Sequence, residues 1–482
     1  MVRALAIDVG SSSIRTGLVD ELGKVSNVHQ ARLAVQTPHP GEVELDPVEI
    51  ARLSLELAER TLRDGGKCDV MGVTNQRATT IVFDPLTGEA VGPAISWQDL
   101  RTVIDCLVLQ GEGLHLAPNQ SATKAAWLVS QSGRQAKDLR FATIETWIAW
   151  HLSGGDTFVS DRSNASVNGL VDTTMTSWDE RVVSLLHLDT SMFPRLVDTM
   201  GALGVASALT GAPRITSLVG DQPASLFGQS CIRSGAKITF GTGAMLDMVH
   251  GSSAPTSMNI FDSGCYPTVV RSRDDVTTWG IEGIILSAGS CVDWLCDLEL
   301  ITEPIDSERL AQSVVSAEGV SFVPALSGLG TPQWDFGARG AFFGLTRGSS
   351  RAHLVRAVLE GIAQRGADLL DAAEDEIGEQ LTELRVDGGM SVNRFFVQRL
   401  ADFSGHTVTV SSEREATTRG AGLMALVGAG HLTLDDVEHL WTPAFVATPS
   451  LSDDARQSAR AEWRTTVQRA ERTIPELSAV SF

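Results

Sequence analysis

Two short motifs contain the residues best suited to chemistry. Asp221 follows the apolar run from Ile215 to Val219, so we expect it on the loop at the end of a strand. A lone carboxylate in that position can accept a proton from a hydroxyl group. About twenty residues later, Gly241-Thr242-Gly243 separates two apolar segments, and glycines at such a turn let backbone N–H groups approach a phosphate closely. A plain hairpin turn explains this second motif equally well.

A similar hairpin is expected at the N-terminus. Asp8 lies near the end of the apolar segment from Arg3 to Val9, and Ser11-Ser12-Ser13 forms a turn before an apolar return strand. This turn offers N–H and O–H donors to a phosphate, and the carboxylate can hold Mg²⁺ through water. A serine-rich turn with a capping aspartate is the alternative. Because the pattern recurs about 230 residues later, we expect a duplicated architecture with one ligand between its halves.

Three further positions suit ligand binding. Arg77 follows a strand at Val70 to Thr74 and could donate a fork of hydrogen bonds to a hydroxylated ligand, or else form a surface salt bridge. Trp97, at another strand end, is either a core residue or an apolar wall for the carbon face of a polyol. Asp387-Gly388-Gly389-Met390 lies between a strand and a helix that begins at Asn393, a good place for a nucleotide.

The surrounding segments must position these residues. Ser287 to Leu295 is rich in small residues and enters a helix, which suits close backbone approach. Phe322 to Arg347 reads as an ordered loop region whose charges lock the loop, and Arg351 to Leu370 as a long helix. Asp161 to Asn168 is expected to be a solvated polar connection. The domain boundary is expected near Ser230 to Gly235.

Composition limits the class of protein. The 482 residues are 43% hydrophobic and 20% charged, as in a soluble protein of two or three domains. A net charge of −21 argues against binding nucleic acid or an anionic membrane, though not against ATP. The six cysteines form no CxxC pair, so we expect no zinc site and a reducing compartment. Asp8 interrupts any signal-peptide core and no apolar run could span a membrane, so the expected location is the cytoplasm.

Taken in order, the motifs resemble the FGGY family of carbohydrate kinases, and within it the glycerol kinases most closely. The resemblance runs from about Arg3 to about Leu440. It implies an α/β fold of two actin-like, ribonuclease-H-type domains, 1–233 and 234–482, with ATP in the cleft between them. It also implies transfer of the γ-phosphoryl group to a hydroxyl of a sugar or polyol, and assembly as a homodimer or homotetramer. The motifs are DVGSSSIR, GVTNQRATT, AISWQDLRT, SATKAAWL, VGDQPASLFGQ, TFGTGAML, FVPALSGLGTPQWDFGARGAFFGLTRG and RVDGGMSVNRF.

The resemblance also assigns roles to residues of this chain. Asp221 would be the general base, and Asp8 with Asp221 would lie near Mg²⁺. Asp293 takes the place of a glutamine that lies near the nucleotide in glycerol kinases. The residues expected around ATP are Ser11, Ser12, Ser13 and Arg15 of the first hairpin, Gly241, Thr242 and Gly243 of the second, and Gly289, Asp293, Gly389 and Asn393.

The substrate side departs from the glycerol-kinase pattern. Ala78 replaces a glutamate, Asn119 replaces a tyrosine, and Met245 stands where an aromatic residue is common. The single tyrosine of the chain, Tyr266, is far along the sequence from Asn119. These changes predict a substrate other than glycerol and larger, such as a tetritol, a pentitol or a ketose. The residues of the pattern that remain are Arg77, Trp97, Asp221 and Gln222.

Three alternatives stay open. The first is a true glycerol kinase with an altered pocket. The second is a non-catalytic sensor that binds ATP and sugar, although the presence of both Asp8 and Asp221 favours an active enzyme. The third is an ATPase of the actin or chaperone type, which would give Arg77, Trp97 and Gln222 no function.

Overall fold

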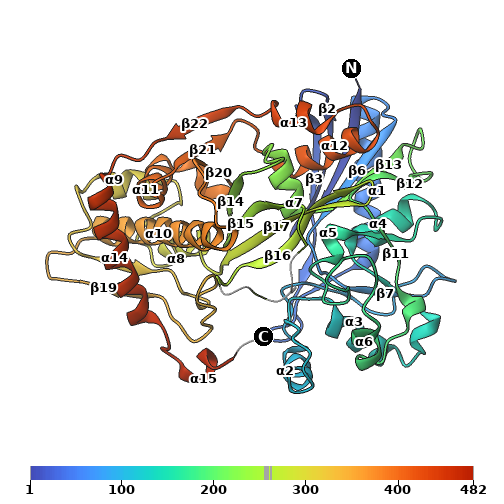
Figure 1. The fold of residues 1–482 in the computed structure, drawn as a ribbon, viewed down its shortest axis with the longest axis horizontal. Coiled ribbons are helices and arrows are strands. Elements are labelled where there is room, and N and C mark those ends of the chain that lie inside the picture. The colour runs from blue at the N-terminus through green and yellow to red at the C-terminus, as the bar shows by residue number, and fades with distance from the viewer. Residues whose placement is uncertain (1, 255–259, 261–262, 481–482) are drawn as a thin grey trace.

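A six-stranded sheet forms the centre of the N-terminal half in the computed structural model, which describes residues 2–254, 260 and 263–480 (Figure 1). Its strands alternate buried residues between two faces, because successive side chains of a strand point to opposite sides. The strand order is β12-β13-β6-β1-β2-β3, with bounds Met200–Val205, Arg214–Gly220, Val70–Asn75, Arg3–Val9, Ser13–Asp20 and Val25–Arg32.

A seven-stranded sheet forms the centre of the C-terminal half (Figure 1). The order is β16-β17-β15-β14-β20-β21-β22, with bounds Tyr266–Arg273, Val276–Ile285, Ala244–Gly251, Ala236–Phe240, Glu383–Asp387, Thr407–Ser411 and Pro443–Ala447.

The two sheets share one topology. In each, a hairpin pairs antiparallel (β1 with β2, β14 with β15) and a third strand pairs antiparallel with the hairpin (β3, β17). On the other side, the first strand of the hairpin pairs parallel with β6 or β20, and these pair parallel with β13 or β21. This duplication confirms the predicted α/β fold of two ribonuclease-H-type sheets.

Helices cover both faces of the first sheet. On one face, α1 (Pro47–Gly65) and α4 (Ile144–Leu152) pack on Leu5 and Ile7 of β1. On the other, Ala4 and Ala6 pack against α12 (Ala416–Gly428) and α7 (Asp221–Gly228). Helix α12, orange-red in Figure 1, therefore lies on the blue strands although in the chain it stands between β21 and β22 of the second sheet.

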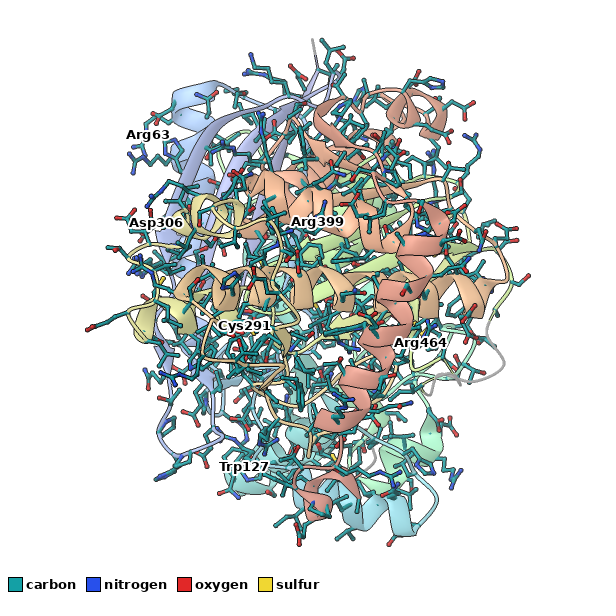
Figure 2. The ribbon with its side chains drawn as sticks, turned by 90° about the vertical axis from the view of Figure 1, so that its left-hand side faces the viewer. Arg63, Trp127, Cys291, Asp306, Arg399 and Arg464 are labelled. Carbon is teal, nitrogen blue, oxygen red and sulfur yellow. The ribbon has the colours of Figure 1, made fainter. Side chains whose placement is uncertain are left out.

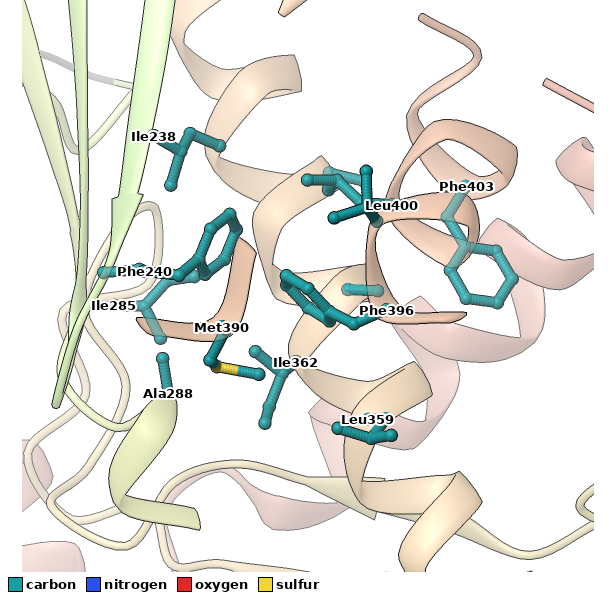
Figure 3. Close-up of a cluster of buried hydrophobic side chains, with 14 of the residues drawn as sticks. Ile238, Phe240, Ile285, Ala288, Leu359, Ile362, Met390, Phe396, Leu400 and Phe403 are labelled. Carbon is teal, nitrogen blue, oxygen red and sulfur yellow. The ribbon is translucent and has the colours of Figure 1, made fainter. Parts of the chain in front are cut away.

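The core of the second half lies between its sheet and three helices, α8 (Gly289–Asp297), α10 (Arg351–Ile377) and α11 (Arg394–Ser404). Phe240 of β14 meets Phe396 of α11 edge to face, with ring centroids 4.8 Å apart (Figure 3). Helix α14 (Asp453–Ala470) crosses in front of α10 in Figure 2, and Trp463 donates a 2.9 Å hydrogen bond to Asp368.

Shorter elements connect these layers. The remaining helices are α2 (Val103–Gly111), α3 (Ala122–Ser132), α5 (Arg162–Ala165), α6 (Glu180–Leu185), α9 (Asp306–Gln312), α13 (Leu434–Glu438) and α15 (Pro475–Ser478), with 3₁₀ turns at Ala136–Asp138, Thr190–Met192 and Gly389–Val392. The remaining strands are β4 (Val35–Gln36), β5 (Glu44–Leu45), β7 (Ile81–Phe83), β8 (Ala94–Ile95), β9 (Arg140–Ala142), β10 (Val159–Asp161), β11 (Arg195–Val197), β18 (Ser321–Val323) and β19 (Ala341–Phe343).

One segment was predicted wrongly. Asp161 to Asn168, expected to be a solvated connection, ends β10 and forms the short helix α5, and most of its residues are buried. Its polar side chains are buried because they bond to one another and to their neighbours. Asn164, for example, donates to Asp161 at 2.7 Å and accepts a hydrogen bond from Asn75 at 2.9 Å.

The loop region from Phe322 to Arg347 is ordered as predicted. Asp335 accepts hydrogen bonds from the backbone N–H groups of Gly337 and Arg472 and from the hydroxyl of Ser478. Within the described part of the chain, no helix is long and apolar enough to cross a membrane.

Candidate active site

A cavity of about 270 Å³ lies between the two halves. Its wall combines residues of the first half with residues of β15, β16 and β17 of the second sheet. All seven residues predicted on the substrate side line it together: Arg77, Ala78, Trp97, Asn119, Asp221, Gln222 and Met245. Thr268, Glu282 and Gln120, for which no role was predicted from the sequence, also line it.

Asp221 stands at the start of α7, directly after β13. Its carboxylate accepts a 2.8 Å hydrogen bond from the backbone N–H of Gln222, and Nε of Arg77 lies 3.7 Å from Oδ1. Burial raises the pKa of Asp221 above its ordinary range, and the positive charges of Arg77 and Lys237 oppose the shift. A carboxylate with a raised pKa, open to a cavity, is suited to take a proton from a hydroxyl group.

Arg77 is buried, so the alternative of a surface salt bridge is wrong. Its guanidinium forms an ion pair with Glu282 of β17 and donates a long, 3.5 Å hydrogen bond to Thr268 of β16. Burial raises the pKa of Glu282 to about 7, an effect that Arg77 opposes. Arg77 therefore links the strand end that carries it to the opposite half of the molecule, beside Asp221.

A row of polar residues crosses the cavity face of the second sheet. By strand register, Tyr266 stands opposite Glu282, Glu282 opposite Asp247, and Asp247 opposite Lys237. Lys237 lies 2.8 Å from Asp247 and donates a 2.6 Å hydrogen bond to Gln222. The buried ion pair thus holds the side chain of Gln222, next to Asp221. Single polar residues inside otherwise apolar strands were the sequence signal for this row.

The opposite wall comes from the first half. The indole N–H of Trp97 donates a 3.2 Å hydrogen bond to Ser11, so the ring is fixed at the cavity and Ser11 also faces it. Ala78 has a left-handed backbone with φ of 59°, and its carbonyl accepts a hydrogen bond from Ser121 at 3.0 Å. Asn119 is exposed at the rim.

The first hairpin places a second carboxylate near Asp221. Asp8 is buried at the end of β1, where its pKa rises to about 7 through burial, and the charge of Asp221 adds to this effect. Nη1 of Arg15 lies 3.7 Å from Asp8 and 2.8 Å from Glu415. Two adjacent carboxylates fit Mg²⁺, which usually keeps several waters and takes one or two carboxylates. Among the described residues, no group of three or more His, Cys, Asp or Glu side chains is arranged to hold a metal.

The second hairpin is held by the N-terminus of α8. The N–H of Gly289 donates to the carbonyl of Gly241 at 2.9 Å, and that of Ser290 to Thr242 at 3.0 Å. A Cβ on Gly289 would lie 2.5 Å from the carbonyl oxygen of Gly241, so only glycine permits this approach. The turn from Gly241 to Gly243 leaves Thr242 exposed.

The other predicted nucleotide residues have different surroundings. Gly389 is exposed, and a Cβ there would meet open space. Asn393 caps α11 by accepting from the N–H of Phe396 at 2.9 Å, and it donates to Ser307 at 3.2 Å. Asp293 is exposed on α8. On the first turn, Ser12 is exposed and Ser13 accepts a hydrogen bond from Gln30.

A buried polar network supports the site from behind. The N–H of Gly220, the residue before Asp221, donates a 2.9 Å hydrogen bond to the hydroxyl of Ser163. Ser163 in turn donates to Asp161 at 2.5 Å. This network, in the segment predicted to be solvated, fixes the strand end from which Asp221 emerges.

Two family models match most of the chain. The model described as the FGGY family of carbohydrate kinases, N-terminal domain, matches residues 3–228, and the C-terminal domain model matches residues 236–429. A glycerol kinase from Aromatoleum aromaticum is 39% identical over 491 residues, which cover 97% of this chain and 98% of the relative.

Solved structures of carbohydrate kinases share the fold of this chain. The structure of Plasmodium falciparum glycerol kinase with ADP has a TM-score of 0.90 and 28% identity, covering 100% of this chain and 99% of that one. A xylulose kinase from Rhodospirillum rubrum has a TM-score of 0.81 and 24% identity, covering 97% and 98%, and shares the fold.

Proposed function

Because the chain belongs to the FGGY family of carbohydrate kinases and is a phosphotransferase acting on an alcohol group, we propose that its acceptor is a small polyol or ketose larger than glycerol. The observation that carries the proposal is Asp221, which opens into a cavity lined from both halves and faces Arg77. In this proposal Asp221 takes the proton of the acceptor hydroxyl as its oxygen bonds to the γ-phosphorus of ATP and the bond to ADP breaks.

The remaining residues bind and orient. Arg77 and Gln222 would hydrogen-bond the hydroxyl groups of the substrate, with Trp97 along its carbon face. The hairpin turns at 11–13 and 241–243, with Arg15, would hold the phosphates of ATP. Gly289, Asp293, Gly389 and Asn393 would surround the rest of the nucleotide, Asn393 through its backbone because its side chain already caps α11.

Asp8 and Asp221 would hold Mg²⁺, which supplies neutralisation of phosphate charge when bound. The buried carboxylate of Asp8, close to a second carboxylate, is the observation that supports this assignment.

The size and wall of the cavity favour a substrate larger than glycerol. A cavity of about 270 Å³ has room for an acceptor with more carbons than glycerol. Ala78 and Asn119 stand where glycerol kinases carry larger side chains, so the cavity gains room and loses partners for glycerol hydroxyls.

The domain division, location and assembly are inferred from the motifs and composition of the sequence. We infer domains at 1–233 and 234–482, a homodimer or homotetramer, and a cytoplasmic location. The six free thiols are in keeping with a reducing compartment.

An ADP-release assay with ATP and Mg²⁺ tests the proposal. The panel contains glycerol, erythritol, threitol, the pentitols, xylulose, ribulose and no acceptor. We expect the highest kcat/KM with a four- or five-carbon acceptor. Highest turnover of glycerol would identify a glycerol kinase with an altered pocket, and binding without turnover would identify a sensor.

The base is tested in the same assay. Asp221→Asn should lower kcat by about 10²- to 10⁴-fold, because the amide cannot take the proton. Asp105→Asn, at an exposed position on α2, is the matched control and should leave kcat unchanged. Wild-type turnover by Asp221→Asn would remove Asp221 as the base.

A further inference from the structure

Tyr266, the single tyrosine of the chain, lines the same cavity as Asn119 although 147 positions separate them. Its place follows from register: it is the first residue of β16 and stands opposite Glu282 of β17. Directly opposed residues of an antiparallel pair project from the same face of the sheet. Because Glu282 pairs with Arg77 in the cavity, Tyr266 is next to the group that links Arg77 to the second sheet.

The aromatic ring of Tyr266 is held in place from behind. Trp334 meets it edge to face, with ring centroids 5.1 Å apart and planes at 73°. The indole N–H of Trp334 donates a 2.6 Å hydrogen bond to the carbonyl of Gly264. The ring therefore has a fixed position on a strand of the sheet, as a recognition residue requires.

The phenol group itself remains available to a ligand. Across residues 2–254, 260 and 263–480, the Tyr266 hydroxyl forms no hydrogen bond, and its nearest acidic neighbour, Glu282, is engaged with Arg77. Burial and the charge of Glu282 raise the pKa of Tyr266, so its hydroxyl stays protonated at neutral pH. An O–H at the wall of a polar cavity, with no partner within the protein, can donate a hydrogen bond to a ligand that enters the cavity.

The position of Tyr266 fits the far end of an extended acceptor. Asp221 lies 3.7 Å from Arg77, Arg77 contacts Glu282, and Tyr266 is one strand further, about 4.8 Å away between backbones. A substrate whose reacting hydroxyl lies at Asp221 must extend past Arg77 to reach Tyr266. An acceptor of four or five carbons extends further in this direction than glycerol does.

We propose that Tyr266 determines specificity by hydrogen-bonding the hydroxyl or carbonyl at the far end of an acyclic polyol or ketose of four or five carbons. This inference rests on the proposed function and assigns a residue to it. Ala78 and Asn119 leave space where glycerol kinases carry larger side chains. Tyr266 supplies a hydrogen-bond donor for a longer substrate that fills this space. Tyr266 does not touch the reacting atoms in this proposal, so its effect is on binding.

Tyr266→Phe tests the proposal, because phenylalanine keeps the ring contact with Trp334 and removes the hydroxyl. With the best substrate of the panel, we expect KM to rise about 10-fold, as for the loss of about 1.4 kcal/mol, and kcat to change little. With glycerol, KM should change less than two-fold. The thermal midpoint of the variant should equal that of the wild type, which verifies the fold.

An analogue of the best substrate that lacks the far hydroxyl completes the test; for erythritol this is butane-1,2,3-triol. Wild-type enzyme and Tyr266→Phe should have equal KM values for the analogue, since the bond is absent in both. If a four- or five-carbon acceptor is best but Tyr266→Phe leaves its KM unchanged, the role of Tyr266 is wrong and the proposed function stands. If glycerol is best in the wild type, or if no acceptor is turned over, the proposed function fails and this inference with it.

Discussion

Glu282 and Arg77 determine the electrostatics of the cavity. The pair is buried on both sides, with Asp221 and Asp247 close enough to shift its titration. The cluster contains three carboxylates, those of Glu282, Asp221 and Asp247, and two cations, Arg77 and Lys237. One negative charge therefore remains, which a metal ion or a bound proton can balance. Such a cluster is sensitive to removal of any one charge, because the low dielectric strengthens every interaction in it.

Glu282→Gln should destabilise the protein by about 1–3 kcal/mol, because the buried Arg77 loses its direct ion pair and keeps only the longer, 3.7 Å contact with Asp221. Urea unfolding at pH 8.5 measures the change in unfolding free energy, at a pH where Glu282, with a pKa of about 7, is ionised.

The matched control is Glu56→Gln, which removes the partner of Arg52 in an exposed pair with an N–O distance of 2.9 Å. There the loss should be below about 1 kcal/mol, because solvent screens exposed pairs. Equal, small losses in both variants would contradict a charged Arg77–Glu282 pair.

Helices α7 and α12 cross at two glycines, and this contact sets the position of Asp221. A Cβ on Gly420 would lie 1.8 Å from the carbonyl oxygen of Ala224, and one on Gly228 would lie 1.9 Å from that of Ala416. The helices therefore touch backbone to backbone, which no residue with a side chain allows.

Gly420→Ala should force the helices apart, costing about 1–3 kcal/mol or more of stability and lowering kcat, because α7 begins with Asp221. Gly111→Ala on α2 is the control, since a Cβ there meets nothing within 4 Å. Replacing glycine by alanine adds up to about 1 kcal/mol of helix propensity at either site. The difference in unfolding free energy between the two variants therefore measures the steric crowding at Gly420. Equal unfolding midpoints for the two variants would refute the tight contact.

His406, just before β21, gives the second half a pH-dependent link to α10. Its Nε2 lies 2.9 Å from Glu374, and its Nδ1 lies 2.9 Å from the carbonyl of Ser404, so both nitrogens face acceptors. Burial lowers the pKa of His406, but the hydrogen bond and charge of Glu374 outweigh it and the net pKa is raised.

The stabilisation by His406 is therefore complete below pH 6.5, the ordinary value, and is lost as the pH rises through the raised folded-state pKa. His406→Gln should lower the unfolding free energy by about 1–3 kcal/mol at pH 5.5 and by less at pH 9. His39→Gln, at an exposed position, should have little effect at either pH. A His406→Gln loss that is greater at pH 9 would reverse the assigned sign.

Local sequence patterns predicted the hairpins and strand ends. Contacts between distant parts of the chain, which those patterns do not contain, determine which side chains meet in the cavity. The hairpin turns at 11–13 and 241–243 and the strand end at Asp221 were predictable, because each depends on a few adjacent residues. Glu282 and Tyr266 were missed because β16 and β17 form a local hairpin, whereas Arg77, against which that hairpin packs, lies 205 positions from Glu282 in the sequence. Asp161 to Asn168 was predicted wrongly because a polar segment is expected to be exposed to solvent. Its burial can be predicted only when the hydrogen-bond partners of its side chains, such as Asn75, are known.

At the scale of the molecule, the halves are joined by two separate sets of contacts. In the first, Thr199 and Ser272 exchange three hydrogen bonds of 2.8–3.0 Å between the first half and β16. In the second, α12 leaves the second half and packs on the first sheet, where Arg419 donates to the carbonyl of Gly23 at 3.0 Å. These two sets of contacts fix the relative position of the two sheets between which the cavity lies.

A fragment of residues 1–233 should fail to fold cooperatively, because it lacks α12. Four buried apolar residues of that helix, Leu423, Met424, Leu426 and Val427, contribute about 6–12 kcal/mol at 1.5–3 kcal/mol each, comparable to the whole stability of a domain. Without them the face of the first sheet that includes Ala4, Ala6 and Val19 is open to water. Fusing residues 412–440 to the fragment through a flexible linker should restore a cooperative urea transition, while an equally long fusion of 451–479, which contains α14, should not. A cooperative transition in the unfused fragment would mean that the first sheet is stable without α12, and that the helix serves to join the halves rather than to complete a core.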